Sequence, residues 1–309
     1  MRKIGSWVMV GLLVLGLLAG CSSKSALEPS DKEQGKDQSM TIGLSISTLN
    51  NPFFVTLREG AEKAAKEAGA KLIVTDAQND TAQQANDVED LIQKKVDILL
   101  INPTDSKAVA AAIESANQAD IPVITVDREA EKGKVRSHIA SDNVEGGKMA
   151  GDLILNKIDG KGKIVELEGI PGTSAARDRG KGFHKAVDNK GGVEVVASQP
   201  ANFDRAKGLS VMENILQSKK DIQAVFAHND EMALGALQAI QSAKKDILVV
   251  GFDATDDAVK AVEKGNLAAT IAQRPVEIGQ KAVQIAVKVG KGESVKKFYP
   301  VKLEMVTKD

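Results

Sequence analysis

From Thr41 to near the C-terminus, short apolar runs alternate with longer amphipathic segments, and this pattern is the strongest constraint on the fold. Such alternation is typical of parallel β-sheets whose strands are joined by helical crossovers. The apolar runs are rich in β-branched residues, which predicts strands that are buried on both faces. We expect eight strands, which lie at 41–47, 72–75, 98–101, 123–126, 163–167, 193–197, 224–227 and 247–250.

The segment after the first strand shows a clear helical periodicity. Phe54, Leu57 and Ala61 recur on one side while Arg58 and Glu62 lie on the other, which predicts an amphipathic helix. Similar helices are expected near 81–94, 106–119, 144–157, 174–188, 204–217, 231–242 and 276–289. Eight such units suit either one closed barrel or two open sheets, and their spacing does not separate these alternatives.

The first twenty residues are typical of a secretory signal rather than of a folded domain. Two positive charges at Arg2 and Lys3 precede an uncharged apolar run over 4–18. That run is shorter than the roughly 20 residues that a membrane-spanning helix requires. We therefore expect a signal peptide at 1–20 and leave it out of the predicted fold.

Cys21 is the only cysteine of the chain, and it follows the predicted signal directly. The letters LAGC at 18–21 resemble a bacterial lipobox, whose cysteine is lipidated after cleavage; an ordinary signal with a coincidental cysteine is the alternative. Residues 22–40 carry almost nothing apolar, so we expect 21–40 to be a flexible tether. Acyl chains on Cys21 would anchor the protein to the outer face of the cell membrane.

Charge and motifs exclude several classes of function. Removing the signal moves the formal net charge from −1 to −3. No basic patch stands out, so nucleic acid is not an expected partner. The three histidines lack ligand spacing, so we expect no metal. No dinucleotide fingerprint, phosphate-binding loop or nucleophile elbow occurs, and we expect no cofactor.

Polar and aromatic side chains concentrate where the predicted strands end, which is where open parallel sheets bind ligands. Carboxylates accept hydrogen bonds, guanidinium groups donate them and amides do both, so together they suit the hydroxyls of a small polyol. Aromatic faces suit a sugar ring, and Phe53, Phe54, Phe203 and Phe252 lie at or beside strand ends. In the first half the candidates are Asn50, Asn51, Phe53, Phe54, Asn102, Asp127 and Arg128. In the second half they are Thr173, Arg177, Arg179, Phe203, Asp204, Asn229, Asp230, Asp253 and Gln273.

Each candidate also has a simpler interpretation. Asn51 and several of the acids suit helix N-caps. The two phenylalanines after the first strand suit the core, and Asp127 with Arg128 suits a surface ion pair. The clustering of these side chains at strand ends is what favours a binding site.

From Thr41 onward the chain resembles the bacterial ribose-binding proteins of the ABC-importer system. Several of the shared segments are specific as strings and not only as composition. The segments are STLNNPFF (47–54), LLINPTDS (99–106), PVITVDRE (122–129), SHIASDN (137–143), GTSAARDRG (172–180), SQPANFDR (198–205), HNDEMALGAL (228–237), VVGFD (249–253) and AATIAQ (268–273).

This resemblance implies an α/β fold of two Rossmann-like lobes with parallel sheets, joined by three hinge crossings, and not a barrel. In the family this is the type I periplasmic-binding-protein fold. The first lobe would comprise 41–141 and 274–302, and the second 142–273 and 303–309. The crossings would fall near 141–143, near 273–274 and close to the C-terminus.

The resemblance also implies the contacts with the sugar and the partners. The expected ligand-binding residues are Asn51, Phe53, Phe54, Asp127, Arg128, Arg179, Phe203, Asn229, Asp253 and Gln273. The three phenylalanines would sandwich the ring. The expected protein is an extracytoplasmic monomer, not an enzyme, that captures D-ribose by hinge closure and delivers it to the membrane subunits of an ABC importer.

Three alternatives stay open at this point. The same fold could bind a related monosaccharide, such as another pentose, a hexose or a furanose-like signalling molecule. A sugar-responsive transcriptional regulator shares the fold, but it requires a helix-turn-helix where this chain has a signal and tether. A sugar hydrolase would use two carboxylates, for which Asp127 and Asp253 have the right type.

Overall fold

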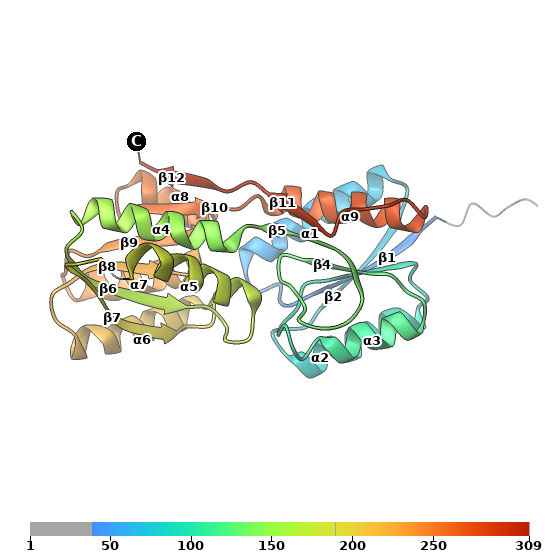
Figure 1. Cartoon of the computed structure of the whole chain (residues 1–309), viewed down its shortest axis with the longest axis horizontal. Helices are drawn as coiled ribbons and strands as arrows, with labels where there is room; N and C mark the ends of the chain where they lie inside the picture. Colours follow the sequence, from blue (N-terminus) through green and yellow to red (C-terminus); the bar gives the residue numbers. More distant parts are fainter. Residues whose placement is uncertain (1–38, 189, 309) are drawn as a thin grey trace, which may run out of the picture. The chain divides into compact units, whose positions relative to one another are not determined.

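The computed structural model describes residues 39–188 and 190–308, which form two open β-sheets with helices on both faces of each (Figure 1). The first sheet has the strand order β11-β5-β4-β3-β1-β2, and all its neighbouring strands are parallel. Its strands are β1 (Thr41–Ile46), β2 (Lys71–Asp76), β3 (Ile98–Ile101), β4 (Val123–Val126), β5 (Val135–Ser141) and β11 (Phe298–Val301). Its helices are α1 (Pro52–Glu67), α2 (Thr81–Gln93), α3 (Ala110–Gln118) and α9 (Pro275–Gly290).

The second sheet has the order β12-β10-β9-β8-β6-β7, in which only the pair of β10 and β12 is antiparallel. Its strands are β6 (Gly162–Glu168), β7 (Val193–Pro200), β8 (Ile222–Ala227), β9 (Leu248–Asp253), β10 (Ala269–Ala272) and β12 (Glu304–Thr307). Its helices are α4 (Asn143–Lys157), α5 (Ser174–Val187), α6 (Arg205–Ser218), α7 (Asp230–Ser242) and α8 (Asp256–Glu263).

The chain passes between the two sheets three times. It leaves the first sheet after β5, returns to it after β10, and leaves it again between β11 and β12. Two open sheets with these crossings exclude the closed barrel and confirm the two-lobed fold. The residue limits that we assign to the two lobes stay a prediction.

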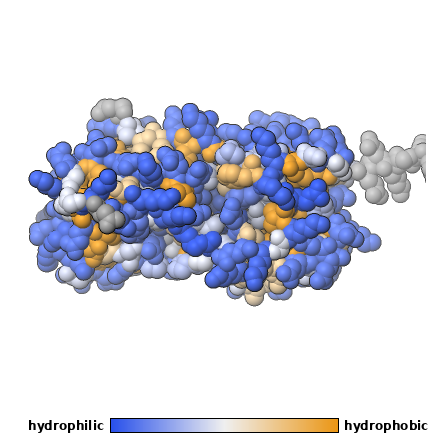
Figure 2. All heavy atoms as spheres, viewed as in Figure 1, coloured by the Kyte–Doolittle hydropathy of each residue, from blue (hydrophilic) through white to orange (hydrophobic). Residues whose placement is uncertain are grey.

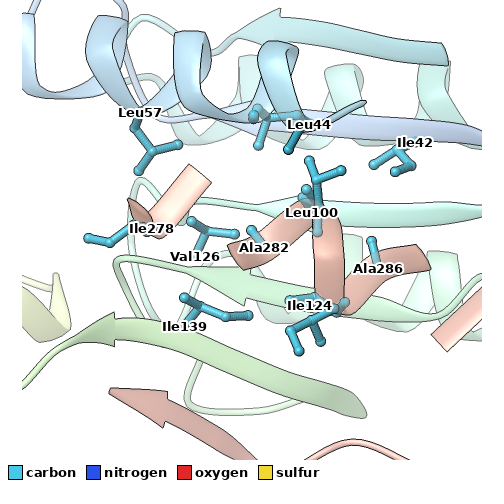
Figure 3. Packing of buried hydrophobic residues seen from close by; sticks show 14 of the residues in the cluster. Ile42, Leu44, Leu57, Leu100, Ile124, Val126, Ile139, Ile278, Ala282 and Ala286 are labelled. Atoms are coloured by element: carbon cyan, nitrogen blue, oxygen red, sulfur yellow. The ribbon is translucent and has the colours of Figure 1, made fainter. Parts of the chain in front are cut away.

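Apolar side chains cover both faces of the first sheet. Figure 3 shows Leu57 of α1 and Ile278 of α9 packed over strand residues such as Leu44, Leu100 and Val126. A second cluster fills the opposite face beneath α2 and α3. Every residue of β3 and β4 is buried, which confirms the expectation drawn from their continuous apolar runs.

Six of the nine helices in the described ranges begin at a residue whose side chain accepts a hydrogen bond from an amide of the first turn. The Asn51 side chain accepts a hydrogen bond from the Phe53 amide at 2.9 Å, and proline follows it in the first turn of α1. Thr173 caps α5 by accepting from the Ala176 amide at 3.3 Å. These caps fix where the strand-to-helix loops end, and those loops carry the candidate binding residues.

The visible surface is mostly hydrophilic, with apolar residues scattered between polar ones (Figure 2). Among the described residues, Val276 and Phe298 are the large apolar side chains that lie exposed, at 42% and 40%. No helix in the described ranges combines the length and the apolar character that a membrane span needs.

Candidate ligand-binding site

Side chains from both sheets line one small cavity where the parallel strands end. Its volume is about 240 Å³, including its opening to solvent. The lining residues are Asn51, Phe53, Phe54, Asp127, Arg128, Ala175, Arg179, Phe203, Asn229, Asp253 and Gln273. All ten side chains that the sequence suggests for a sugar thus meet in one place, and their role in binding it stays a prediction.

The first sheet contributes a buried carboxylate beside a buried guanidinium group. Oδ2 of Asp127 lies 3.8 Å from Nε of Arg128 and accepts a hydrogen bond from Asn102 Nδ2 at 3.3 Å. Nη1 of Arg128 donates to the carbonyl of Pro103 at 3.2 Å. Burial raises the pKa of Asp127 above its usual value, although both neighbouring arginines oppose that rise. Burial also lowers the pKa of Arg128 to about 10.

The second sheet contributes Arg179, which several groups hold in place. Its Nε donates to Oδ1 of Asn143 at 2.8 Å, and its Nη1 donates to the carbonyl of His228 at 2.5 Å. The guanidinium carbon lies 3.8 Å from the centre of the Phe252 ring, a cation–π contact. Nη1 is also 3.7 Å from Oδ1 of Asp253. Arg179 therefore has a fixed position at the wall of the cavity.

Asp253 and Gln273 join this wall from neighbouring strands. Gln273 Nε2 donates to Oδ1 of Asp253 at 2.8 Å. Burial raises the pKa of Asp253 well above its usual value, against the opposing charge of Arg179. Two carboxylates and two guanidinium groups thus share one buried cavity, so their formal charges balance.

Three buried polar atoms of the cavity residues lack a hydrogen-bond partner within the part of the chain that the structure describes. They are Oδ1 of Asp127, Nε of Arg128 and Oε1 of Gln273. A buried polar atom without a partner is costly, so such atoms point to a ligand that supplies the missing groups. Two of the atoms accept hydrogen bonds and one donates, which a compound with several hydroxyls can match.

Aromatic rings from both sides face the charged groups. The Arg128 guanidinium lies 5.1 Å from the Phe54 ring centre and 5.3 Å from that of Phe203. Phe53 meets Phe54 edge-on at 5.1 Å. Phe53 and Phe54 belong to the core of the first sheet and also line the cavity, so the core interpretation holds for them and their role in binding stays a prediction.

Three cavity residues adopt backbone angles that favour glycine. The φ angle is 65° at Asp127, 58° at Phe203 and 123° at Asp253. Non-glycine residues at positive φ are uncommon, and they cluster at functional sites where the surrounding structure holds them. These angles aim the side chains of two acids and one aromatic residue at the cavity.

Direct contacts join the two sets of loops beside the cavity. The Ser106 amide donates to the Gly172 carbonyl at 3.0 Å, and the Ser174 amide donates to Ser106 Oγ at 3.2 Å. The Glu129 amide donates to Ser174 Oγ at 2.8 Å. These hydrogen bonds link loops of the first sheet to the start of α5, the helix that carries Arg179.

The other candidate residues lie outside this cavity lining. Asn102 supports Asp127, and Asp204 accepts from the Lys207 amide at 2.7 Å as the N-cap of α6. Asp230 accepts from Thr270 Oγ1 at 2.6 Å, and burial raises its pKa to about 7. Asn50, Thr173 and Arg177 are also absent from the lining. Cys21 lies outside the described residues.

Sequence reasoning missed two of the residues that support Arg179. Asn143 and His228 contact it from positions 36 and 49 residues away. Phe252 is expected as an aromatic residue near a strand end, but its contact with Arg179, 73 residues away, is not. They follow or end strands as the candidates do, but nothing in the sequence indicates that they meet this arginine. No group of side chains in the described ranges has the arrangement of a metal site.

The sequence matches the family model described as "Periplasmic binding protein domain" over residues 42–294. The chain belongs to the periplasmic binding protein family. It is 53% identical over 306 residues to the "Ribose import binding protein RbsB" of Bacillus subtilis strain 168, which covers 98% of this chain and 99% of that relative.

Solved structures of other periplasmic binding proteins share the fold. An ABC transporter solute binding protein from Mycobacterium smegmatis with bound glycerol superposes with a TM-score of 0.85 at 36% identity, covering 87% of this chain and 94% of that one. A periplasmic solute binding protein from Actinobacillus succinogenes 130z with bound D-allose gives 0.82 at 33% identity, with 87% and 98% covered. The same two-lobed fold thus holds small polyhydroxy compounds in these relatives.

Proposed function

We propose that this periplasmic binding protein captures D-ribose outside the cytoplasm and delivers it to an ABC importer. One observation carries the proposal: the residues expected to bind sugar converge on one buried cavity in which donors and acceptors are left unpaired. The name of the B. subtilis relative supports ribose in particular. The proposed role is binding and delivery, without catalysis.

The proposed sugar would complete the hydrogen bonds of the cavity. Hydroxyls would donate to Asp127 Oδ1 and Gln273 Oε1 and accept from Arg128 Nε. Arg179, Asn229 and Asp253 would meet the hydroxyls on the other side, and the phenylalanine rings would pack on the C–H faces of the ring. Both charged pairs would then be shielded from water by the ligand itself.

The proposed mechanism is closure of the two lobes around the sugar. The ligand would contact loops of both sheets, so it would favour the arrangement in which both sets of contacts form. A ligand shifts such an equilibrium only by its differential affinity for the two states. The hydrogen bonds of Ser106 and Ser174 would add to this difference without touching the sugar. The importer would then recognise the closed form.

We also propose that the protein acts as a monomer, anchored to the outer face of the cell membrane by lipid on Cys21. The LAGC sequence after an apolar segment supports the lipid anchor. Mass spectrometry of protein purified from membranes tests it, because Cys21→Ser should abolish an acyl modification on the N-terminal residue.

Ribose should raise the melting temperature of the purified protein more than any other monosaccharide in a panel. A ligand that binds only the native state stabilises it by RT ln(1 + [L]/Kd), or about 2.7 kcal/mol at a hundredfold excess over Kd. A thermal-shift screen measures this ranking. A larger rise in melting temperature with a hexose or with another pentose would identify that sugar as the ligand in place of ribose. The proposed binding role would be unchanged.

Replacing Asp127 with alanine should weaken ribose binding by about 1.5 to 3 kcal/mol, the range for hydrogen bonds to a charged group. Isothermal titration calorimetry measures the change. Asp152→Ala is the control, because the Asp152 side chain on α4 is 48% exposed, lies outside the cavity lining and forms an ion pair with Lys148 of the same helix. An unchanged affinity in Asp127→Ala would remove this carboxylate from the site.

A further inference from the structure

A buried carboxylate and a buried histidine form a pair behind the cavity wall. Glu166 of β6 is fully buried and His228 is 1% exposed. Their side chains meet at 2.9 Å between Oε1 of Glu166 and Nε2 of His228. The Gly169 amide lies 3.3 Å from Nδ1 of the same ring and donates to it. Since Nδ1 accepts, the ring proton lies on Nε2 and points at Glu166.

The pair lies outside the cavity lining, yet it adjoins three residues that form the lining. The carbonyl of His228 accepts the 2.5 Å hydrogen bond from Arg179, and the next residue in the chain is Asn229. Gly169, which donates to the histidine ring, lies under Phe203: a Cβ added at Gly169 would lie 2.0 Å from Cζ of that ring. His228 thus adjoins three groups of the site: the Arg179 guanidinium, the Asn229 amide and, through Gly169, the Phe203 ring.

Glu166 is fixed from its other side as well. Ser198 Oγ donates to Oε2 of Glu166, and Nε2 of His184 lies 3.1 Å from the same oxygen. Burial alone would raise the pKa of Glu166, but the hydrogen bond from His228 and the contacts with Ser198 and His184 lower it below its usual value. A buried anion needs such donors, so Glu166 holds the His228 ring in one orientation.

We infer that Glu166 and His228 are a positioning pair for the sugar site. The pair acts through the His228 carbonyl on Arg179 and through Gly169 on Phe203, and it does not contact the sugar. The pair holds the cavity side chains of the second sheet in the geometry that binds the ligand. Fewer of these side chains then have to become ordered when the ligand binds. This inference rests on the proposed sugar-binding function.

Replacing His228 with leucine removes both side-chain hydrogen bonds and leaves Glu166 Oε1 and the Gly169 amide without their partners. The dissociation constant for ribose should rise by about tenfold or more, because Arg179 and Phe203 lose their preorganised positions. His228→Gln should restore affinity to within about threefold of the original protein, because its amide can donate to Glu166. Calorimetry on the full chain measures both values.

The matched control is His138→Leu. His138 is also a largely buried histidine with a side-chain partner, Thr125 Oγ1 at 3.0 Å, but it lies in the first sheet and outside the cavity lining. This variant should bind ribose as the original protein does. If His228→Leu folds and also binds ribose with unchanged affinity, the pair is only part of the core and the inference is wrong.

A measurement without sugar separates this inference from the proposed function. The Nε–H resonance of Arg179 in a ¹⁵N NMR spectrum should shift or broaden in His228→Leu and stay in place in His228→Gln and His138→Leu. If the original protein fails to bind ribose, the proposed function fails, whereas the Arg179 signal still tests the pair. An unchanged signal in His228→Leu would overturn the inference even if ribose binds.

Glu166→Gln provides a second variant in case His228→Leu fails to fold. It keeps the shape of the side chain and an oxygen for His228, but it removes the charge that strengthens the hydrogen bond. The ribose dissociation constant should rise several-fold, by about threefold or more, and the Arg179 signal should shift. If Glu166→Gln folds, and both its ribose dissociation constant and its Arg179 signal equal those of the original protein, the positioning role is contradicted.

Discussion

Replacing Arg179 with methionine is expected to raise the dissociation constant for ribose by more than about 100-fold and to destabilise the fold. Methionine keeps much of the apolar bulk over the Phe252 ring but loses the hydrogen bonds to Asn143 and His228. Asp253 then loses its guanidinium neighbour while it stays buried. Removing one partner of a buried charge pair costs about 3 to 5 kcal/mol.

Calorimetry with ribose and denaturant unfolding measure the two effects of this substitution. Arg177→Met is the control, because Arg177 lies on the same helix but is 45% exposed and pairs with Glu131 at 3.5 Å. Exposed pairs contribute at most about 1 kcal/mol, so the control should bind within about fivefold of the original protein. Comparable ribose affinities for the two variants would refute the role assigned to Arg179.

Much of the fold follows from the sequence because buried parallel strands are continuous apolar runs. All eight expected strands are present, but β5, β10, β11 and β12 and the short helix α8 were not expected. β5 carries an arginine, two serines and a histidine within seven residues, and only part of it is buried. β11 and β12 are four-residue edge strands, where a short or half-exposed segment gives no clear apolar pattern.

The cavity residues were predictable because parallel strands deliver their carboxyl ends to one edge of a sheet. The cap and ligand interpretations of Asn51 do not exclude each other, since Asn51 caps α1 and lines the cavity. Asn229 also caps a helix and lines the cavity, although no cap was expected there. The supporting residues were not predictable. Glu166 lies within a strand and His228 follows another, 62 residues apart, and only the paired strands β6 and β8 bring them together.

Backbone strain in the cavity had no sequence signal either. Asp127, Phe203 and Asp253 stand at positive φ where glycine would be expected on conformational grounds alone. Their side chains are the reason that glycine does not suit these positions, because each faces the cavity. The conformational cost at these three positions is tolerated because the site needs their side chains. Backbone propensity alone would therefore predict turns there and would not indicate functional side chains.

Replacing Gly182 with valine is expected to destabilise the fold by more than about 3 kcal/mol, because α4 and α5 pack backbone to backbone at this position. A Cβ added at Gly182 would lie 1.9 Å from the carbonyl oxygen of Val144, and one added at Gly147 would lie 2.0 Å from that of Arg179. Neither backbone can yield without separating the helices. The melting temperature should fall by roughly 6 to 12 °C.

Gly191→Val is the control, because a Cβ added at Gly191 meets open space, and it should leave the melting temperature nearly unchanged. Because α5 carries Arg179, ribose binding should weaken along with stability in Gly182→Val, and equal melting temperatures for the two variants would refute the close helix contact.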